Sequence, residues 1–211
     1  MELAGLLGGA SPALTPDLLV VPYTSGEVYA LHPGNGLPLW NETLVSLTKL
    51  DPLSSLFHVK ARPIVKGTHV YLIGNGGVMR CLDAASGKTV WSHKFGGMRS
   101  PALSGDYLFM ITSNNELTCM NRLDGRVHWV KQLPRYENEE KKDAPLLWAG
   151  PILVNDTVAI AGSNGKAFLM SVQNGETKQE LDLGHQTLLS PIAVEGNLIF
   201  LTDSGDLISY R

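Results

Sequence analysis

Residues 26–40 read GEVYALHPGNGLPLW and residues 77–91 read GVMRCLDAASGKTVW, so one pattern of glycines and a closing tryptophan occurs twice. Self-similarity at a regular period is typical of proteins that are built from stacked structural repeats. Five prolines begin five repeats: Pro12, Pro63, Pro101, Pro151 and Pro191. In each repeat, the residue 14 positions after the proline occupies a predicted turn, which we call the first turn. The first turn carries Gly or Asn in every repeat, and both residues tolerate a positive φ.

A second turn lies 24 residues after each of the first four prolines, at Gly36, Gly87, Gly125 and Gly175. Each of these glycines follows Asn, Ser or Asp, and such pairs favour the tight turn of a two-stranded hairpin. Four residues later the pattern has tryptophan in three repeats and glutamine in the fourth: Trp40, Trp91, Trp129 and Gln179. Because the indoles recur at one place in the outermost strand, we expect them and the turn glycines to hold adjacent repeats together.

The segments between these turns have the character of strands. Short aliphatic runs such as residues 70–73 suit a buried strand, and the following segments alternate apolar and polar residues. Each repeat therefore predicts four antiparallel strands. The first is short and follows the proline, the second is aliphatic, the third ends before the hairpin turn, and the fourth carries the tryptophan.

Four-stranded sheets that recur every 38 to 51 residues pack face against face around an axis. The sequence thus predicts an all-β fold, a partial β-propeller of about five four-stranded blades that forms a single domain over residues 1–211. The expected repeats are 11–43, 62–95, 100–133, 150–183 and an incomplete 190–211. A β-sandwich needs no recurrence in register, and the glycine-rich turns argue against a helical solenoid. Five blades can close a small ring, but we favour the second half of a larger propeller.

Composition limits the classes of function. The chain is 44% hydrophobic and 18% charged with a formal net charge of −3, which gives no broad basic surface for nucleic acid. Aliphatic runs are too short to span a membrane, and residues 1–10 lack the basic start and long apolar stretch of a secretory signal. An export signal, if there is one, is therefore expected outside this sequence.

Two connectors between repeats are long, residues 41–62 and 130–150. In an antiparallel four-stranded blade, the chain leaves the fourth strand at the same end as the turn between strands two and three. Both long connectors are therefore expected on one face, where they either bind a partner or merely cover the blade junctions. The run ENEEKKD at 137–143 is interpreted as a solvated loop tip, whose mixed charges can also steer a partner.

The residues that most often carry chemistry have structural explanations here. Cys81 and Cys119 occupy equivalent positions of neighbouring repeats, which favours packing in the third strand over catalysis. Asp83 shares its position with other turn-forming residues, so we interpret it as a turn residue. The six histidines fall at six different repeat positions, and a metal site needs at least three ligands to converge. The sequence predicts no catalytic residue, no metal site and no cofactor.

The G-x-V-Y-A-L…G-x-x-x-W unit resembles the repeat of pyrroloquinoline-quinone-type (PQQ-like) propellers. Longer stretches, AGLLGGASPAL at 4–14, VVPYTSGEVYAL at 20–31, WVKQLPRYENEE at 129–140, WAGPIL at 148–153 and LTDSGDLISYR at 201–211, are similar to the C-terminal portion of the BamB family, nearest its alphaproteobacterial form. The resemblance implies part of an eight-bladed, non-enzymatic lipoprotein scaffold at the periplasmic face of the outer membrane. It also implies that the lipid-bearing cysteine and the first blades precede Met1, so that the membrane is reached only through that anchor.

The same resemblance implies that the partner is a BamA-type outer-membrane assembly protein, bound through its periplasmic repeat domains. The partner-facing connectors would place Leu6, Leu7 and Gly8 before Pro12 at the surface. Before Pro63, where some relatives have two acidic residues, this chain has His58 and Lys60, so the local charge is reversed. For Leu6 and Leu7, burial as the tail of a preceding strand stays an open alternative.

Other classes of function fit the same repeat. PQQ-like repeats also build quinone-dependent dehydrogenases, so the chain can be a fragment of such an enzyme, and an extracytoplasmic sensor domain of the same fold is a third possibility. A scaffold with exposed strand edges can also bind unfolded outer-membrane proteins by adding a strand to a sheet.

Overall fold

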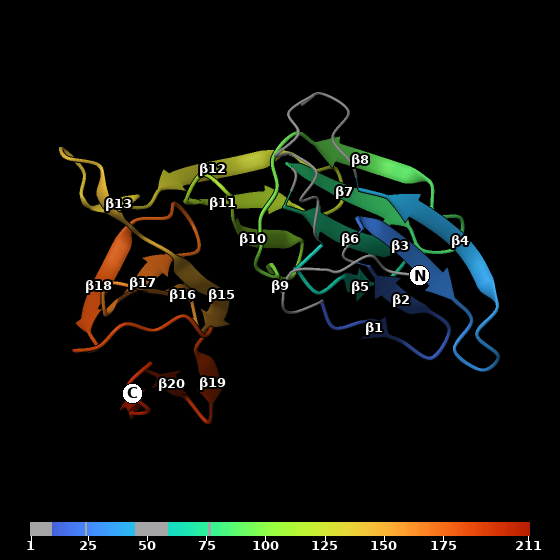
Figure 1. Ribbon diagram of the computed structural model, residues 1–211. Helices are drawn as coiled ribbons and strands as arrows, with labels where there is room; N and C mark the ends of the chain where they lie inside the picture. Colours follow the sequence, from blue (N-terminus) through green and yellow to red (C-terminus); the bar gives the residue numbers. More distant parts are fainter. Residues whose placement is uncertain (1–9, 24, 45–58, 76) are drawn as a thin grey trace. The chain divides into compact units, whose positions relative to one another are not determined.

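A computed structural model describes residues 10–23, 25–44, 59–75 and 77–211 (Figure 1). These residues form strands and turns, and none of the described segments is a helical span suited to a lipid bilayer. The chain divides into two compact units. Unit 1 comprises Met1–Ser100 and Leu123–Gly125, and unit 2 comprises Pro101–Arg122 and Arg126–Arg211.

Unit 1 contains two antiparallel four-stranded sheets, in which each strand pairs with the next strand of the sequence. Blade 1 consists of β1 (Ala13–Leu14), β2 (Leu19–Pro22), β3 (Glu27–Leu31) and β4 (Pro38–Thr43). Blade 2 consists of β5 (Ile64–Lys66), β6 (His69–Gly74), β7 (Val78–Asp83) and β8 (Thr89–His93).

Unit 2 contains two further four-stranded sheets, one three-stranded sheet and one isolated hairpin. Blade 3 consists of β9 (Ala102–Ser104), β10 (Tyr107–Ile111), β11 (Glu116–Asn121) and β12 (Val127–Gln132). Blade 4 consists of β15 (Trp148–Val154), β16 (Thr157–Gly162), β17 (Lys166–Ser171) and β18 (Thr177–Asp182). Blade 5 consists of β19 (Ile192–Val194), β20 (Asn197–Leu201) and β21 (Leu207–Tyr210). The separate hairpin consists of β13 (Tyr136–Asn138) and β14 (Asp143–Pro145). The predicted all-β fold of antiparallel four-stranded sheets is confirmed.

The hydrophobic cores lie between sheets, as packing of blade against blade requires. In unit 1, Val20 and Ala30 of blade 1 share a buried cluster with Val70 and Leu72 of blade 2. Unit 2 has one cluster between blades 3 and 4 and another between blades 4 and 5. The aliphatic second strands of blades 2, 3 and 4 are buried on both faces, which contributes roughly 1.5–3 kcal/mol for each fully buried Val or Leu side chain. This burial explains why they read as continuous apolar runs.

The third and fourth strands of each complete blade share a β-bulge that the sequence analysis did not predict. One residue of the fourth strand is skipped in the register, just before the tryptophan position. The skipped residues are Leu39, Val90, His128 and Lys178. In a bulge, two residues of one strand lie opposite one residue of its partner, so it can be recognised only once the two strands are paired. The bulge bends its strand and changes the direction of the side chain.

The bulge sets the tryptophan opposite a small residue of the third strand. Trp40 pairs with Ala30, Trp91 with Cys81, and Trp129 with Cys119. In blade 4, where glutamine replaces the tryptophan, the opposite residue is the larger Leu169. The two cysteines are buried, which confirms that they are small packing residues of the third strand.

Candidate functional site

Each blade has two different ends. The turn between the second and third strands and the exit of the fourth strand lie together, and we call this the connector end. A backbone hydrogen bond joins the two features: Leu44 N–H donates to Gly26 O (2.9 Å), Leu133 N–H to Asn115 O (2.9 Å), and Leu183 N–H to Gly165 O (2.7 Å). The predicted position of the outgoing chain is thus confirmed for blades 1, 3 and 4. The other end, with the turns between strands one and two and between strands three and four, is the opposite end.

The three leucines that make these bonds are buried, and sequence reasoning missed them. Leu44, Leu133 and Leu183 are 1%, 2% and 3% exposed. The signal was present, because each lies four residues after the tryptophan position of its repeat. These leucines fix the direction in which each connector begins.

The connector between blades 3 and 4, residues 133–147, is held against the connector end of blade 3. Trp148 is 3% exposed, and its Nε1–H donates to Pro134 O at 2.8 Å. Asn115, in the turn of blade 3, donates from Nδ2 to Leu146 O at 2.9 Å. Leu146 N–H in turn donates to Arg135 O at 2.8 Å. The two strands of the connector are thereby joined at their base.

A second set of bonds ties the connector to blade 4. Leu147 and Ser163 exchange two hydrogen bonds, from Leu147 N–H to Ser163 Oγ (3.1 Å) and from Ser163 N–H to Leu147 O (2.9 Å). Ser163 belongs to the turn between the second and third strands of blade 4. The connector therefore bridges the connector ends of two blades in unit 2.

The run that was predicted to be a solvated loop tip forms the hairpin β13–β14, which projects from the sheets in Figure 1. Its tip is exposed, as expected, but local bonds order it. The Glu139 carboxylate accepts from Arg135 N–H at 2.6 Å, and Asn138 Oδ1 accepts from Lys141 N–H at 3.0 Å. The propensity signal was weak because charged residues dominate the segment. The result is an exposed, charged hairpin whose base is anchored to the blades.

The predicted partner-binding residues are placed only in part. Leu6, Leu7, Gly8 and His58 lie outside the described residues. Lys60 is described, and it is half-buried on the chain that enters blade 2, between Val59 and Ala61, which are 2% and 1% exposed. These buried neighbours hold the backbone at Lys60 in place.

The turn glycines lie against the tryptophans of the preceding blade. A Cβ on Gly87 would lie 2.8 Å from the Trp40 ring, one on Gly125 2.8 Å from Trp91, and one on Gly175 2.7 Å from Trp129. No described atom would lie within 4 Å of a Cβ on Gly36. Two indoles also donate across the junction, from Trp40 Nε1 to Ala84 O (2.8 Å) and from Trp129 Nε1 to Val172 O (3.1 Å).

A second recurring hydrogen bond lies next to the prolines and was also missed. Arg62 N–H donates to Ser100 Oγ at 2.9 Å, and Gly150 N–H donates to Ser190 Oγ at 3.0 Å. Each donor precedes the proline of one repeat, and each serine precedes the proline of the next. The recurring Ser-Pro pairs were therefore the available signal.

Groups that were weighed for catalysis have structural surroundings. Burial raises the pKa of the Cys119 thiol to about 11, which keeps it protonated and unreactive. The Ser86 hydroxyl and backbone N–H donate to Asp83 Oδ1 at 2.6 and 2.8 Å and lower the pKa of that carboxyl. Asp83 is the last residue of β7, and its carboxylate holds the turn that follows, which agrees with its predicted role in a turn. Within the described ranges, no three His, Cys, Asp or Glu side chains converge into a possible metal site.

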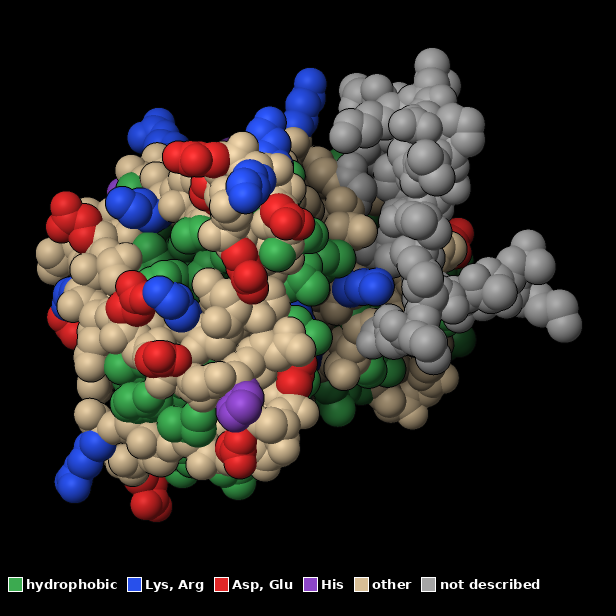
Figure 2. All heavy atoms as spheres, turned by 60° about the vertical axis from the view of Figure 1, so that its left-hand side comes forward, with side chains coloured by type: hydrophobic (Ala, Val, Ile, Leu, Met, Phe, Trp, Pro, Cys, Tyr) green, Lys and Arg blue, Asp and Glu red, His purple; other side chains and the backbone are tan. Residues whose placement is uncertain are grey.

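The described surface carries charges of both signs. In Figure 2, acidic and basic side chains are interspersed over the visible face, with hydrophobic side chains exposed between them. Exposed ion pairs such as Lys166 with Glu180 (2.6 Å) contribute little to stability.

The profile of a protein family described as outer membrane protein assembly factor BamB matches residues 2–131. Outer membrane protein assembly factor BamB of Legionella pneumophila (strain Paris) is 25% identical over 202 residues, which cover 96% of this chain and 50% of that protein. The chain thus spans about half the length of the curated relatives that it matches.

Two solved structures share the fold. The crystal structure of BamB from Moraxella catarrhalis aligns with a TM-score of 0.82 at 16% identity and covers 99% of this chain and 60% of that chain. Quinohemoprotein alcohol dehydrogenase from Comamonas testosteroni aligns with a TM-score of 0.70 at 13% identity and covers 97% of this chain and 41% of that chain. At these identities, both structures show likeness of fold alone. The match of the family profile to more than half of the sequence decides between these relatives, and the chain belongs to the family of outer membrane protein assembly factor BamB.

Proposed function

We propose that the chain is part of a non-enzymatic scaffold in outer-membrane protein assembly, which binds the periplasmic domains of a BamA-type protein through the connector ends of its blades. On this proposal it works at the periplasmic face of the outer membrane, and a lipid anchor outside this sequence holds it there. Family membership supports the process, and the anchored connectors support the mode of binding.

The observation that carries the proposal is the rigid connector of residues 133–147. Its base is tied by side-chain and backbone bonds to the turns of two blades, while its charged tip stays exposed. A rigid base reduces the conformational entropy that binding must remove, and mixed exposed charges influence the rate of association. Long connectors that only covered a junction would have no need of an ordered, projecting hairpin.

We extend the contact surface to the residues inferred from the family resemblance. Leu6, Leu7 and Gly8 precede blade 1, and His58 and Lys60 precede blade 2, so all five precede the first strands of their blades. Here the local charge before Pro63 is basic where some relatives are acidic. We therefore expect the surface of the BamA-type partner that meets Lys60 to be acidic.

A charge reversal with a matched control tests the proposal. Lys60→Glu is compared with Lys88→Glu, which lies in the same blade at the opposite end and is exposed. Binding of the BamA-type periplasmic domains, measured by isothermal titration calorimetry, is expected to weaken about tenfold in Lys60→Glu and to stay within twofold in Lys88→Glu. Equal effects of the two variants, or no binding by the parent chain, would refute the proposed surface.

A further inference from the structure

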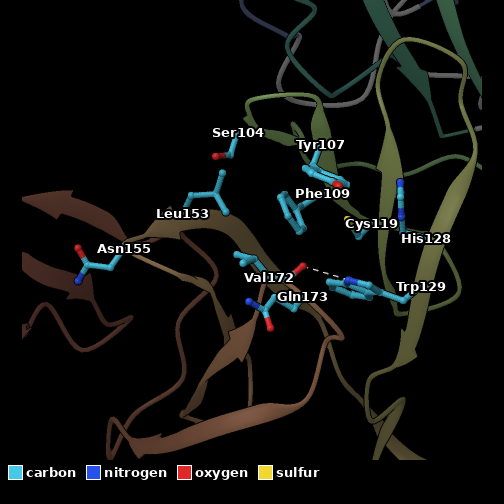
Figure 3. A pocket seen from close by; sticks show the side chains of 10 residues that line it. All are labelled: Ser104, Tyr107, Phe109, Cys119, His128, Trp129, Leu153, Asn155, Val172 and Gln173. Atoms are coloured by element: carbon cyan, nitrogen blue, oxygen red, sulfur yellow. Dashed lines mark hydrogen bonds between the residues drawn. The ribbon is translucent and has the colours of Figure 1, made fainter.

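A pocket of about 320 Å³ opens at the junction of blades 3 and 4, toward their opposite ends (Figure 3). Ser104 lies where β9 ends, Asn155 follows β15, and Gln173 follows β17. These three positions lie in or beside the turns at the opposite ends of blades 3 and 4, away from the connectors. The pocket is therefore separate from the surface proposed for the BamA-type partner.

The floor of the pocket is rigid and aromatic. Phe109 and Cys119 are each 1% exposed, and both belong to the buried cluster between the two blades. Trp129 lies beside them, with its ring centroid 6.0 Å from that of Phe109. The bond from Trp129 Nε1 to Val172 O, drawn in Figure 3, fixes the indole. A ligand thus meets a preformed surface, which limits the entropy that binding removes.

One wall of the pocket consists of two rings. Tyr107 is 45% exposed, and its ring meets that of His128 edge-on at a centroid distance of 4.9 Å. His128 is the bulged residue of β12, and the bulge explains why its ring turns toward Tyr107 and not into the register of the sheet.

The corresponding position in unit 1 shows that the propeller fold alone does not create this opening. Tyr107 lies six residues after its proline, where blade 1 has Leu18. Leu18 is 5% exposed and packs into the cluster of blades 1 and 2, together with Val65 and Ala84. In blade 3 the tyrosine does not fill the junction in this way, so the space beside Phe109 stays open.

The rim offers neutral hydrogen-bonding groups. The side chains of Ser104, Asn155 and Gln173 line the pocket, and none of them makes a side-chain hydrogen bond to a described residue. No Asp, Glu, Lys or Arg side chain is among the lining residues. Aromatic walls with uncharged donors and acceptors at the mouth select a planar, uncharged group that carries one polar substituent.

We infer that this pocket binds an uncharged aromatic ring with a hydrogen-bonding substituent, such as a phenol or an indole. Its size agrees, because an apolar cavity of about 150 Å³ already accepts benzene and this one is about twice as large. The ring can come from a free small molecule or from a tyrosine or tryptophan side chain of a peptide. Because the pocket and the connectors lie at different ends, this inference does not depend on the proposed function.

Nuclear magnetic resonance titration of the ¹⁵N-labelled chain tests the inference. The probes are 4-methylphenol and 3-methylindole, and the reporter is the Trp129 indole N–H signal, assigned with Trp129→Phe. For ligands of this size we expect dissociation constants of about 0.1–1 mM. 4-Methylcyclohexanol, which has a similar size but no aromatic ring, is expected to bind at least fivefold more weakly.

A capped Gly-Tyr-Gly peptide distinguishes the two sources of the ring. Binding at least tenfold tighter than that of 4-methylphenol indicates a peptide side chain, because backbone contacts then contribute. Equal or weaker binding of the peptide indicates a free small molecule. The inference is overturned if neither aromatic probe shifts the Trp129 signal, or if the cyclohexanol binds as well as the phenol.

Variants locate the binding. Tyr107→Ala is expected to weaken binding of 4-methylphenol at least tenfold, while His69→Ala, at the equivalent position of blade 2, leaves it unchanged. A second variant, Asn155→Gly with Gln173→Ala, removes two rim amides and is expected to weaken binding about tenfold. Glycine suits position 155 because its φ is 52°. Equal effects of Tyr107→Ala and His69→Ala, or unchanged binding in the rim variant, would contradict this placement of the site.

Discussion

The contact between Trp40 and Gly87 gives the sharpest prediction about stability. Gly87 has φ +70°, and an added Cβ would lie 2.8 Å from two atoms of the Trp40 ring and 3.0 Å from its Cβ. The indole is half-buried, and its Nε1–H donates to Ala84 O of the same turn, so it cannot move aside freely. Gly36 has the same φ of +70° in blade 1, and no described atom would touch its added Cβ.

The two glycines thus separate backbone strain from steric contact. A left-handed φ costs a residue with a Cβ about 1–2 kcal/mol, and this cost applies to Gly36→Ala and Gly87→Ala alike. Forcing a methyl group into packed atoms costs about 1–3 kcal/mol more, and this cost applies only to Gly87→Ala. We therefore expect Gly87→Ala to lower the free energy of unfolding by about 2–5 kcal/mol and Gly36→Ala by about 1–2 kcal/mol.

Urea unfolding followed by circular dichroism measures both variants, and a double-mutant cycle with Trp40→Ala isolates the contact. Trp40→Ala removes the ring atoms, two of which would lie 2.8 Å from the new methyl group, and leaves only the Cβ of residue 40 at 3.0 Å. In that background, Gly87→Ala should lose most of its steric cost and retain the cost of φ, which gives a coupling energy of about 1–3 kcal/mol. If Gly87→Ala costs no more than Gly36→Ala, or costs the same with and without Trp40, the indole does not lock the two blades.

Four further predictions concern the second unit. Trp129→Phe should lower the free energy of unfolding by about 1–2 kcal/mol, because Val172 O loses its donor while most of the ring packing remains, and urea unfolding measures the change. At pH 8 the native Cys119 thiol should react with an alkylating reagent about 100-fold more slowly than the unfolded thiol, because a pKa about two units above the ordinary 9.0 leaves far less thiolate. Mass spectrometry of labelled peptides measures the two rates, and equal rates would contradict the prediction. Because the pKa of Cys119 is raised in the folded state, its contribution to the free energy of unfolding is complete below pH 9 and is lost as the pH rises toward 11. Urea unfolding curves at pH 8 and pH 10.5 test this loss. Asn115→Gly keeps a residue that tolerates a φ of 56° but removes the hydrogen bond to Leu146 O. Proteolysis within residues 133–147 should therefore become faster, while the urea midpoint of unfolding changes little. An unchanged rate of proteolysis would show that Asn115 does not hold the connector.

The sequence predicted the fold because the repeat carries several independent signals. Positive-φ turns, aliphatic second strands and the hairpin pairs at Gly36 and Gly87 all agree on antiparallel sheets, and the structure confirms them. The burial of Cys81 and Cys119 followed from their equivalent positions, since the repeat register transfers information between blades. Local signals that occur in four or five copies are reliable even where each is weak.

Features that depend on the pairing of distant residues could not be read in this way. The bulge at His128 appears only when β11 and β12 are aligned, and the hairpin β13–β14 forms in a segment whose composition favours a solvated loop. The anchoring role of Trp148 needs the carbonyl of Pro134, which approaches only because the connector folds back. The aromatic pocket depends on Tyr107, where blade 1 has Leu18. This difference could be interpreted only from the structure, in which Leu18 fills the junction of blades 1 and 2 and the junction of blades 3 and 4 stays open.

The central functional claim is that the connector ends of the blades meet the BamA-type partner. Hydrogen–deuterium exchange of the chain, with and without the partner's periplasmic domains, tests it most directly, because both ends of blade 4 are read in one experiment. The account predicts slower exchange in residues 133–147 on binding and no change in residues 171–176. Protection confined to residues 171–176, or protection in neither segment despite binding, would contradict it.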